Sequence, residues 1–354
     1  MLFVDSSRTV LLSFLLPLAV LTACGADDSG REASAQASSD STPSVTDPLT
    51  VFSGRGAVLV APLMEMFEEQ TGIPVEVRYE KSTQALANRI ATEGEQGDAD
   101  VFFAQDSGWL GALAEAGHLA PLPSDMLSRV PAAYRDPTGK WIGVSGRARV
   151  LVYSPDRFPV EKLPKTLAGL PFAVEPGRVG WAPGNASFQA HVSALRDLWG
   201  EEETRAWLTA MQAAEPKVYP KNSPQVQGVS NGEIDVGWVN HYYLHKLRAA
   251  DPGLQAANYS FRTPGDPGNL MMLSGVGRVA YSDQGPAAEA FIDFLLSPAA
   301  QAYFATETFE YPTVSGIALH PDVPPLDEEL VRADQVSLTD LSGTIVLLRE
   351  LGLQ

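Results

Sequence analysis

The sequence predicts an α/β fold organised as two domains, and three observations support this. Strand-type and helix-type patterns alternate from residue 49 onward, which is typical of a parallel or mixed sheet flanked by helices. About 300 residues follow the N-terminal segment, more than one hydrophobic core usually organises. The strand-type stretch 141–155 is too long for one ordinary strand, so we expect it to cross from one domain to the other.

The chain begins with an apolar run of signal-peptide length, TVLLSFLLPLAVLTAC, which is short for a membrane span. Small residues precede Cys24, the only cysteine in the chain. This pattern resembles a bacterial lipobox and predicts a lipoprotein signal peptide over 1–23, with Cys24 lipidated. The alternative is an ordinary cleaved signal with an incidental cysteine. One cysteine allows no intrachain disulfide and no cysteine-based zinc or iron–sulfur site.

Residues 24–48 are rich in Ser, Ala, Asp and Pro and almost free of large apolar side chains. Such a segment cannot bury enough surface to offset the entropy of ordering. We therefore expect a flexible tether between a lipid anchor and a folded body that begins near Leu49.

The first part of the body alternates regularly between strand and helix. Ligands of such sheets bind beyond the carboxyl ends of the strands, here at 53–56 and 104–107. The expected strands are 49–54, 73–80 and 99–106, and the expected helices are 57–72, 83–97 and 107–119.

The second part follows the long strand 141–155. A strand near Val179 leads through a Gly/Pro/Asn loop into a helix, and the segment 220–247 reads as a polar turn, a helix and a strand. The other expected elements are helices over 186–200 and 203–216, a returning strand over 268–280, a helix pair over 285–308 broken at Ser297-Pro298, and a helical tail over 340–354.

The charge balance and the missing motifs exclude several functions. The formal net charge is −18, from 43 acidic and 25 basic residues, which argues against binding nucleic acid or an anionic membrane surface. The GRG of SGRGAVL is no phosphate loop, because the GK[ST] is missing, and neither GxSxG nor HExxH occurs. The sequence therefore gives no support for a hydrolase or transferase that uses carboxylates of a ligand cleft.

The stretch WVNHYYLHKL, residues 238–247, places Tyr242 and Tyr243 side by side between two histidines. The two phenols could be packing groups, or hard anionic ligands for a highly charged metal ion. Adjacent residues face different ways in a regular helix or strand. Both can bind one ion only if the backbone turns at Tyr242, at a junction of strand and helix. For His241 and His245 we expect supporting or surface roles.

Several segments together resemble one known family: LTVFSGRG, GDADVFFAQD, WIGVSGRARVLVYSP, NGEIDVGWVNHYY and FRTPGDPGNLMMLSG. Their order and spacing are similar to those of the ferric-iron-binding substrate-binding proteins of ABC transporters. The resemblance implies the two-lobed periplasmic-binding-protein fold, with mixed sheets flanked by helices, crossing hinge strands and a ligand cleft between lobes. The implied lobes are 49–146 plus about 272–322, and about 147–271 plus 323–354.

The resemblance also implies a function and a site. The chain would be an exported, monomeric lipoprotein that binds Fe(III) and delivers it to a separate permease and ATPase, without catalysis. Tyr242 and Tyr243 would bind iron as phenolates, because Fe(III) prefers anionic oxygen donors. Carbonate or phosphate would complete the coordination. The residues at the matching anion-binding positions are Arg147, Gly184, Asn185, Ala186, Ser187, Asn222 and Asn240.

The first-lobe half of the implied site departs from the family pattern. Many relatives carry a His or Tyr ligand after the first strand, where this chain reads Phe52-Ser53-Gly54-Arg55-Gly56, and a Glu where it has Gln105. Two phenolates, an anion and waters could still hold iron. Alternatively, Arg55 and Gln105 face an anionic chelator that carries the metal, or the same fold binds a different small anion.

Overall fold

A computed structural model of the chain describes residues 47–80, 82–326 and 340–354. The expected signal peptide, Cys24 and nearly all of the tether lie outside these residues. The folded body begins with β1 at Leu49, as predicted, and Thr46–Gln354 form one compact unit. Within the described part, no helix is both long and apolar enough to cross a membrane.

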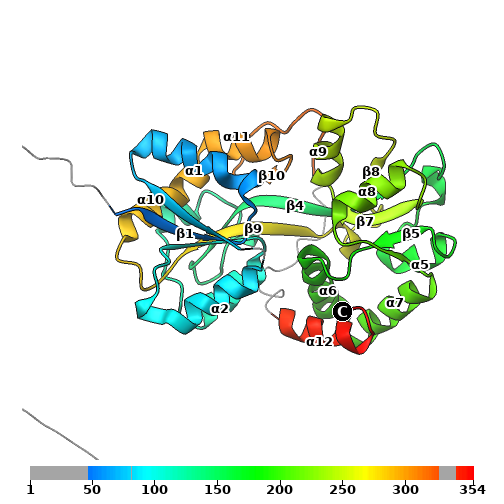
Figure 1. Cartoon of the computed structure of the whole chain (residues 1–354), viewed down its shortest axis with the longest axis horizontal. Helices are drawn as coiled ribbons and strands as arrows, with labels where there is room; N and C mark the ends of the chain where they lie inside the picture. The colour runs from blue at the N-terminus through cyan, green and yellow to red at the C-terminus, as the bar shows by residue number, and fades with distance from the viewer. Residues whose placement is uncertain (1–46, 81, 327–339) are drawn as a thin grey trace, which may run out of the picture. The chain divides into compact units, whose positions relative to one another are not determined.

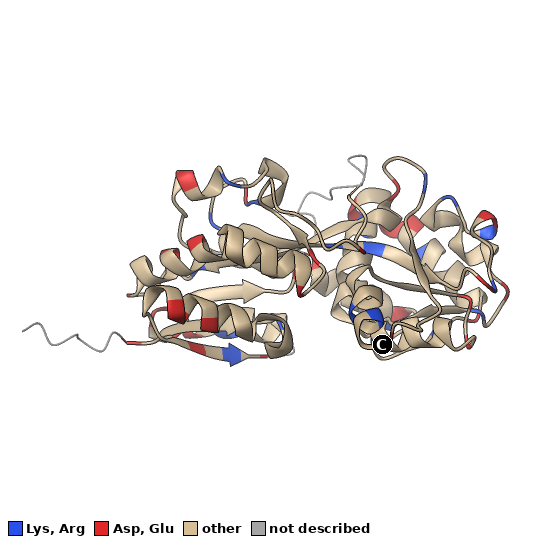
Figure 2. Cartoon of the chain, turned by 90° about the horizontal axis from the view of Figure 1, so that it is seen from above, with Lys and Arg blue, Asp and Glu red and all other residues tan. Residues whose placement is uncertain are grey.

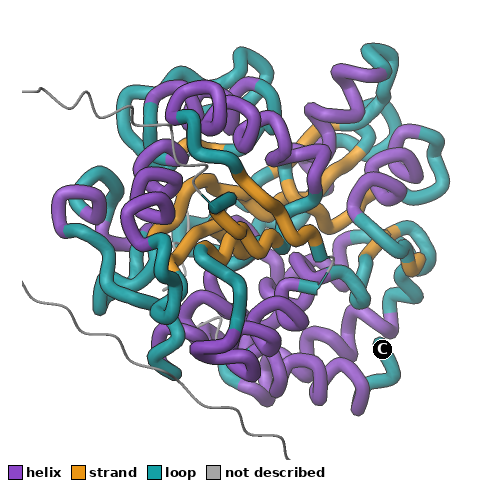
Figure 3. Tube along the Cα trace, turned by 60° about the vertical axis from the view of Figure 1, so that its left-hand side comes forward, coloured by secondary structure: helices purple, strands orange, loops and turns teal. Residues whose placement is uncertain are grey.

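The centre of the body is a mixed sheet with helices packed around it (Figures 1 and 3). The strand order is β2-β1-β3-β9-β4-β7-β5-β6, and β8 and β10 also pair with β4. The strands are β1 (Leu49–Ser53), β2 (Val75–Tyr79), β3 (Val101–Ala104), β4 (Ile142–Tyr153), β5 (Val179–Trp181), β6 (Lys217–Val218), β7 (Val236–Asn240), β8 (Ala257–Tyr259), β9 (Met271–Arg278) and β10 (Tyr311–Pro312).

The predicted order of helices is confirmed. The helix pair breaks at Ser297, whose side chain accepts a hydrogen bond from the backbone N–H of Ala300 and so caps the second helix. The α-helices are α1 (Ala57–Thr71), α2 (Thr83–Glu93), α3 (Ser107–Glu115), α4 (Ser124–Leu127), α5 (Leu170–Ala173), α6 (Ala186–Trp199), α7 (Glu201–Ala213), α8 (Asn222–Ser230), α9 (Tyr242–Ala250), α10 (Gly285–Leu295), α11 (Pro298–Thr306) and α12 (Leu341–Glu350).

Strand β4 carries the long stretch that the sequence marked as a single element. It pairs antiparallel with β9 from Ile142 to Ala148, and with β7 from Arg149 to Tyr153. The change of partner thus falls between Ala148 and Arg149. One continuous strand joins the two sets of strands, as a crossing strand should. The lobe boundaries implied by the family resemblance stay a prediction.

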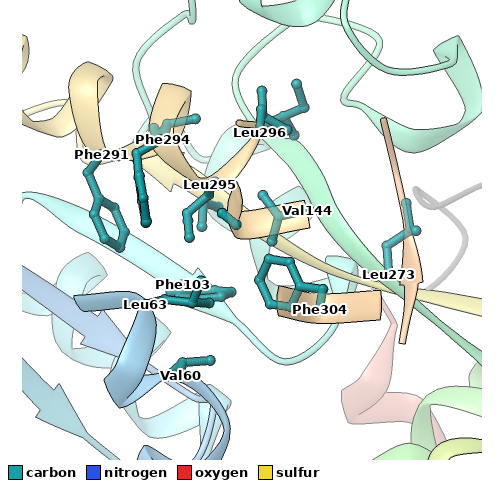
Figure 4. Packing of buried hydrophobic residues seen from close by; sticks show 14 of the residues in the cluster. Val60, Leu63, Phe103, Val144, Leu273, Phe291, Phe294, Leu295, Leu296 and Phe304 are labelled. Atoms are coloured by element: carbon teal, nitrogen blue, oxygen red, sulfur yellow. The ribbon is translucent and has the colours of Figure 1, made fainter. Parts of the chain in front are cut away.

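Two large hydrophobic clusters lie on either side of this partner change. The first packs α1, α10 and α11 against β3 and β9 (Figure 4). Within it, Phe67 and Phe291 are in edge contact, with 5.2 Å between their ring centres. The second is built around Trp181, Trp207 and Trp238. Acidic residues are distributed over many helices and loops (Figure 2), so the net charge does not come from one patch. Some charged side chains are nevertheless buried, among them three arginines and Glu310.

Candidate metal and anion site

The two tyrosines lie at the junction between β7 and α9. Strand β7 ends at Asn240, helix α9 begins at Tyr242, and His241 between them already has helical backbone angles of φ −57° and ψ −41°. This change of direction is the turn that two neighbouring ligands require. The two rings stack with their centres 4.2 Å apart and an interplanar angle of 28°. Tyr242 is buried and Tyr243 is half-buried.

Three arginine side chains, 1–2% exposed, come from two segments beside the tyrosines: Arg55 after β1, and Arg147 and Arg149 on β4. Each guanidinium lies close enough to Tyr242 for that phenol to affect the pKa of the arginine. Burial raises the pKa of Tyr242 well above its usual value, and Tyr243 raises it further, while Arg147 and Arg55 oppose the rise. Tyr242 is therefore a neutral phenol in the ligand-free protein at neutral pH.

Arg55 is neutralised by a buried carboxylate that the sequence reasoning missed. Its Nη2 donates to Glu310 Oε1 at 2.5 Å, and the Ser145 hydroxyl donates to the other carboxylate oxygen. Burial alone would raise the pKa of Glu310, but Arg55 and Arg147 together hold it below its usual range. Arg55 and Glu310 are 255 residues apart along the chain, so no local pattern could have paired them.

Arg149 is saturated by protein acceptors. Its Nε donates to His191 Nδ1 at 3.2 Å, and its Nη2 to the Trp238 carbonyl oxygen at 3.0 Å. Its Nη1 donates to Asn240 Oδ1 at 2.9 Å and to Ser187 Oγ at 3.4 Å. Burial lowers the pKa of Arg149 to about 9. Arg149 therefore holds two of the predicted anion-binding residues, Ser187 and Asn240, in place.

The other predicted anion-binding residues gather at the start of α6. Asn185 caps this helix, and its Oδ1 accepts from the Ser187 backbone N–H at 3.1 Å and from the Ser187 hydroxyl at 2.6 Å. Asn222, the first residue of α8, donates to the same oxygen at 3.3 Å. Asn240 joins this group through Arg149. Donors from the starts of α6 and α8 thus converge on the Asn185 Oδ1, and donors of this kind suit an oxyanion.

Arg147 has a different environment. Its Nη2 donates to the backbone carbonyl oxygen of Gln105, and Asp106 lies close enough to affect its pKa. Burial, and next the nearby Arg55, lower the pKa of Arg147. Its Nε and Nη1 have no hydrogen-bond partner among the residues that the structure describes. Of the three arginines, Arg147 has the most unused hydrogen-bonding capacity.

A pocket of about 360 Å³ lies at the start of α6, where it is also lined by residues of the α2 and α3 starts and by Lys221. Four predicted residues line it, namely Gln105, Gly184, Asn185 and Ala186. Gly56, in the loop after β1, is exposed and has open space beside it. The part of the chain described by the structure contains no cluster of three or more His, Cys, Asp or Glu side chains that could hold a metal.

His241 supports the tyrosine junction from behind. Its Nδ1 accepts from the Ala148 N–H at 3.1 Å, so its Nε2 carries the proton and donates to the Phe309 carbonyl oxygen at 2.8 Å. Burial, and next His245, lower the pKa of His241 to about 3, so it stays neutral. His241 thereby connects β4, through Ala148, to the segment that carries Phe309 and Glu310.

Replacing His241 with Phe should destabilise the protein by about 2–4 kcal/mol, because a buried N–H and a buried carbonyl each lose their partner. Urea unfolding, with His118→Phe as the control, measures this. His118 is only partly buried and its ring contacts Tyr281. Equal unfolding midpoints for the two variants would contradict the assigned role.

Comparisons with known proteins place the chain in a family. Residues 52–302 match the model of the bacterial extracellular solute-binding proteins, and the chain belongs to this family of extracytoplasmic binding proteins. Several of its relatives in the family are named for binding ferric iron, and these homologues are binding proteins rather than enzymes. It is 33% identical over 310 residues to the Fe(3+)-binding periplasmic protein of Serratia marcescens, across 86% of this chain and 90% of that protein.

Solved structures agree with this placement. Iron-bound HitA of Pseudomonas aeruginosa is 32% identical and has a TM-score of 0.81, across 86% of this chain and 99% of that one. A Trichodesmium protein in complex with iron and citrate ligands is 25% identical and has a TM-score of 0.76, across 87% and 100% of the two chains. These neighbours confirm the predicted two-lobed periplasmic-binding-protein fold.

Proposed function

We propose that this protein binds Fe(III) through the phenolates of Tyr242 and Tyr243, together with an exogenous anion, and delivers it to an ABC permease. The observation that carries the proposal is the stacked tyrosine pair at a strand-to-helix junction, surrounded by buried arginines. Phenolate oxygens are hard donors that suit Fe(III), and a bound cation lowers the pKa of its ligands. The iron-binding relatives support the same reading.

The exogenous anion has a defined role here. Gly56 and Gln105 supply no anionic ligand from the first part of the chain, so an anion must complete the coordination. Gly184, Asn185, Ala186, Ser187 and Asn222 would hold it at two helix N-termini, with Asn240 and Arg147 beside them. The neighbour that was solved with iron and citrate supports an anionic partner for the metal.

An absorption titration tests the proposal. The tether-trimmed, metal-stripped protein is titrated with Fe(III) in the presence of bicarbonate or citrate. We expect a visible phenolate-to-iron charge-transfer band that saturates at one iron per protein. If no band appears under either condition, iron is not the ligand, and the alternative of a different small anion on this fold takes its place.

Iron binding should weaken as the pH falls. Burial, and next Tyr243, raise the pKa of Tyr242, so its phenol is protonated in the free protein and must release its proton to bind iron. Each phenol that loses a proton should change the affinity about tenfold per pH unit. Titrations at several pH values, above the range where the anion itself titrates, measure the slope. The Tyr243→Phe variant should show a shallower slope, and equal slopes would contradict proton release from both phenols.

The N-terminal segment would anchor the protein outside the cytoplasm. We propose that Cys24 is lipidated and that residues 24–48 tether the body near the permease and its ATPase, which are separate chains. Cells grown with radiolabelled palmitate should yield labelled wild-type protein and unlabelled Cys24→Ser protein, with the variant released into the soluble fraction. Equal labelling of both would show that Cys24 is incidental.

A further inference from the structure

Another pocket lies where α5 packs against α7 (Figure 1). Its volume is about 290 Å³. Among the described residues, three aromatic side chains, three alanines and Glu203 line it, and none of them lines the pocket at the start of α6. Neither tyrosine of the proposed iron site lies on its wall. The pocket is therefore separate from the proposed iron and anion site.

Two tryptophans form a corner of this pocket. Trp199 ends α6 and Trp207 lies on α7, with 6.1 Å between their ring centres and an angle of 64° between the ring planes. Trp207 is 6% exposed, and its indole N–H donates to the Leu167 carbonyl oxygen at 2.9 Å, which fixes the ring. The other wall residues from α7 include Ala206 and Ala210, whose side chains are small. The corner thus offers aromatic surface to a ligand without rearrangement.

The third aromatic residue of the wall, Phe172 on α5, projects into solvent. It is 80% exposed, and the next most exposed aromatic side chain among the described residues is Tyr79, at 40%. An exposed phenyl ring is stabilised when another surface covers it. Pockets for small molecules enclose most of their ligand, whereas this one has an exposed wall. The arrangement therefore favours a side chain presented by another protein over a free small molecule.

The charge on the wall comes from Glu203, one turn before Trp207 on α7. The nearby Glu201 is paired with Arg196 and Arg205. Glu203, in contrast, makes no ion pair or side-chain hydrogen bond with any residue that the structure describes. An unpaired carboxylate attracts a cation, and so do the negative faces of aromatic rings. The wall is therefore complementary to a cationic group.

We propose that this pocket is a docking site for a second protein, which inserts an arginine side chain from a basic segment between the tryptophan rings and Glu203. A guanidinium can stack on an aromatic ring and donate to a carboxylate at the same time. Arginine and tryptophan are also the residues that most often dominate the binding energy of protein interfaces. The surface around the inserted arginine would cover Phe172. The formal net charge of −18 favours the approach of a basic partner.

The first test uses a probe for the arginine side chain. The protein with isotope-labelled tryptophans is titrated with N-acetylarginine amide and, separately, with its neutral analogue N-acetylcitrulline amide. In nuclear magnetic resonance spectra, the arginine probe should shift the indole signals of Trp199 and Trp207, and the citrulline probe should shift neither. Glu203→Gln should weaken binding of the arginine probe about threefold, the effect of an exposed ion pair. The control Glu202→Gln removes an exposed carboxylate of α7 that does not line the pocket, and should change nothing.

The second test identifies the occupant. A photoreactive phenylalanine analogue replaces Phe172 of the full-length protein in cells that produce it, and cross-linked peptides are identified by mass spectrometry. We expect an arginine-containing segment of another protein. The cross-link should disappear in Glu203→Arg and return when the partner's arginine is changed to glutamate. The same analogue in place of Tyr281, which is exposed and lies outside the pocket, should not capture this segment.

Three results would overturn the docking proposal. The first is that the arginine probe does not bind, or binds as well to Glu203→Gln as to the wild type. The second is that the cross-linked segment has no basic residue. The third is that the probe binds but no protein is cross-linked, which would make the pocket a site for a small organic cation. None of these results bears on the proposed binding of iron.

Discussion

The double variant Tyr242→Phe/Tyr243→Phe is expected to lose the charge-transfer band completely and to bind iron at least about 100-fold more weakly. Removing a group that merely supports a metal ligand costs about 10–100-fold, and this variant removes both protein ligands themselves. The rings can still stack without their hydroxyls, so the fold should persist. Absorption titration with Fe(III) measures the loss, and circular dichroism confirms folding.

A matched control separates ligand loss from a general effect of removing phenols. Tyr303→Phe removes a partly buried tyrosine hydroxyl that donates to the Leu59 carbonyl oxygen, within the first hydrophobic cluster. Its band and affinity should equal those of the wild type. A double variant that retained the band would show that iron binds at another site.

The second large effect concerns the buried ion pair of Arg55 and Glu310. Replacing Arg55 with Met should lower the free energy of unfolding by about 3–5 kcal/mol, because it leaves a buried carboxylate without its main partner. The double variant Arg55→Met/Glu310→Met should recover most of this loss. The control Arg78→Met breaks an ion pair with Glu76 in which both side chains are nearly half exposed, and should cost about 0–1 kcal/mol. Urea unfolding measures all three.

The pH dependence of stability gives this prediction a second readout. The pKa of Glu310 is lowered in the folded protein, so its contribution is fully present above its unfolded pKa and is lost as the pH falls through the folded pKa. In Arg55→Met, burial should instead raise the pKa of Glu310. That variant should become more stable, relative to the wild type, as the pH falls from neutral. If Arg55→Met lost no more free energy of unfolding than Arg78→Met at every pH, the stabilising role of the Arg55–Glu310 pair would be contradicted.

Local patterns were sufficient for the order of the longer elements and for the turn at the tyrosine pair. Apolar spacing predicted the longer helices and strands but not the short α4, α5, β6, β8 and β10. The unusual length of the stretch at 141–155 predicted β4. The demand for a turn at Tyr242 followed from the side-chain geometry of regular elements, and the structure places the junction there. These inferences succeeded because each depends on residues that are neighbours in the sequence.

The partners of the buried charges could not be predicted in this way. Alternation on a strand puts Arg147 and Arg149 on one face, but it does not say which of them is saturated. That depends on His191, 42 residues away, and on Asn240, 91 residues away. His191 sits in a helix with no distinguishing pattern. Glu310 lies in a short segment between α11 and β10, where nothing in the sequence connects it to Arg55.

The partner change on β4 has a consequence for release of the cargo. Arg147 lies opposite Met272 of β9, and Arg149 lies opposite Asn240 of β7. Arg147 therefore lies in the part of β4 that pairs with β9, and Arg149 in the part that pairs with β7, although only Ala148 lies between them. Any torsion of β4 at Ala148 would therefore move the Arg147 guanidinium relative to the Arg149 guanidinium. If the proposed delivery to a permease is correct, a partner that twists β4 would separate the two cations without contacting the site.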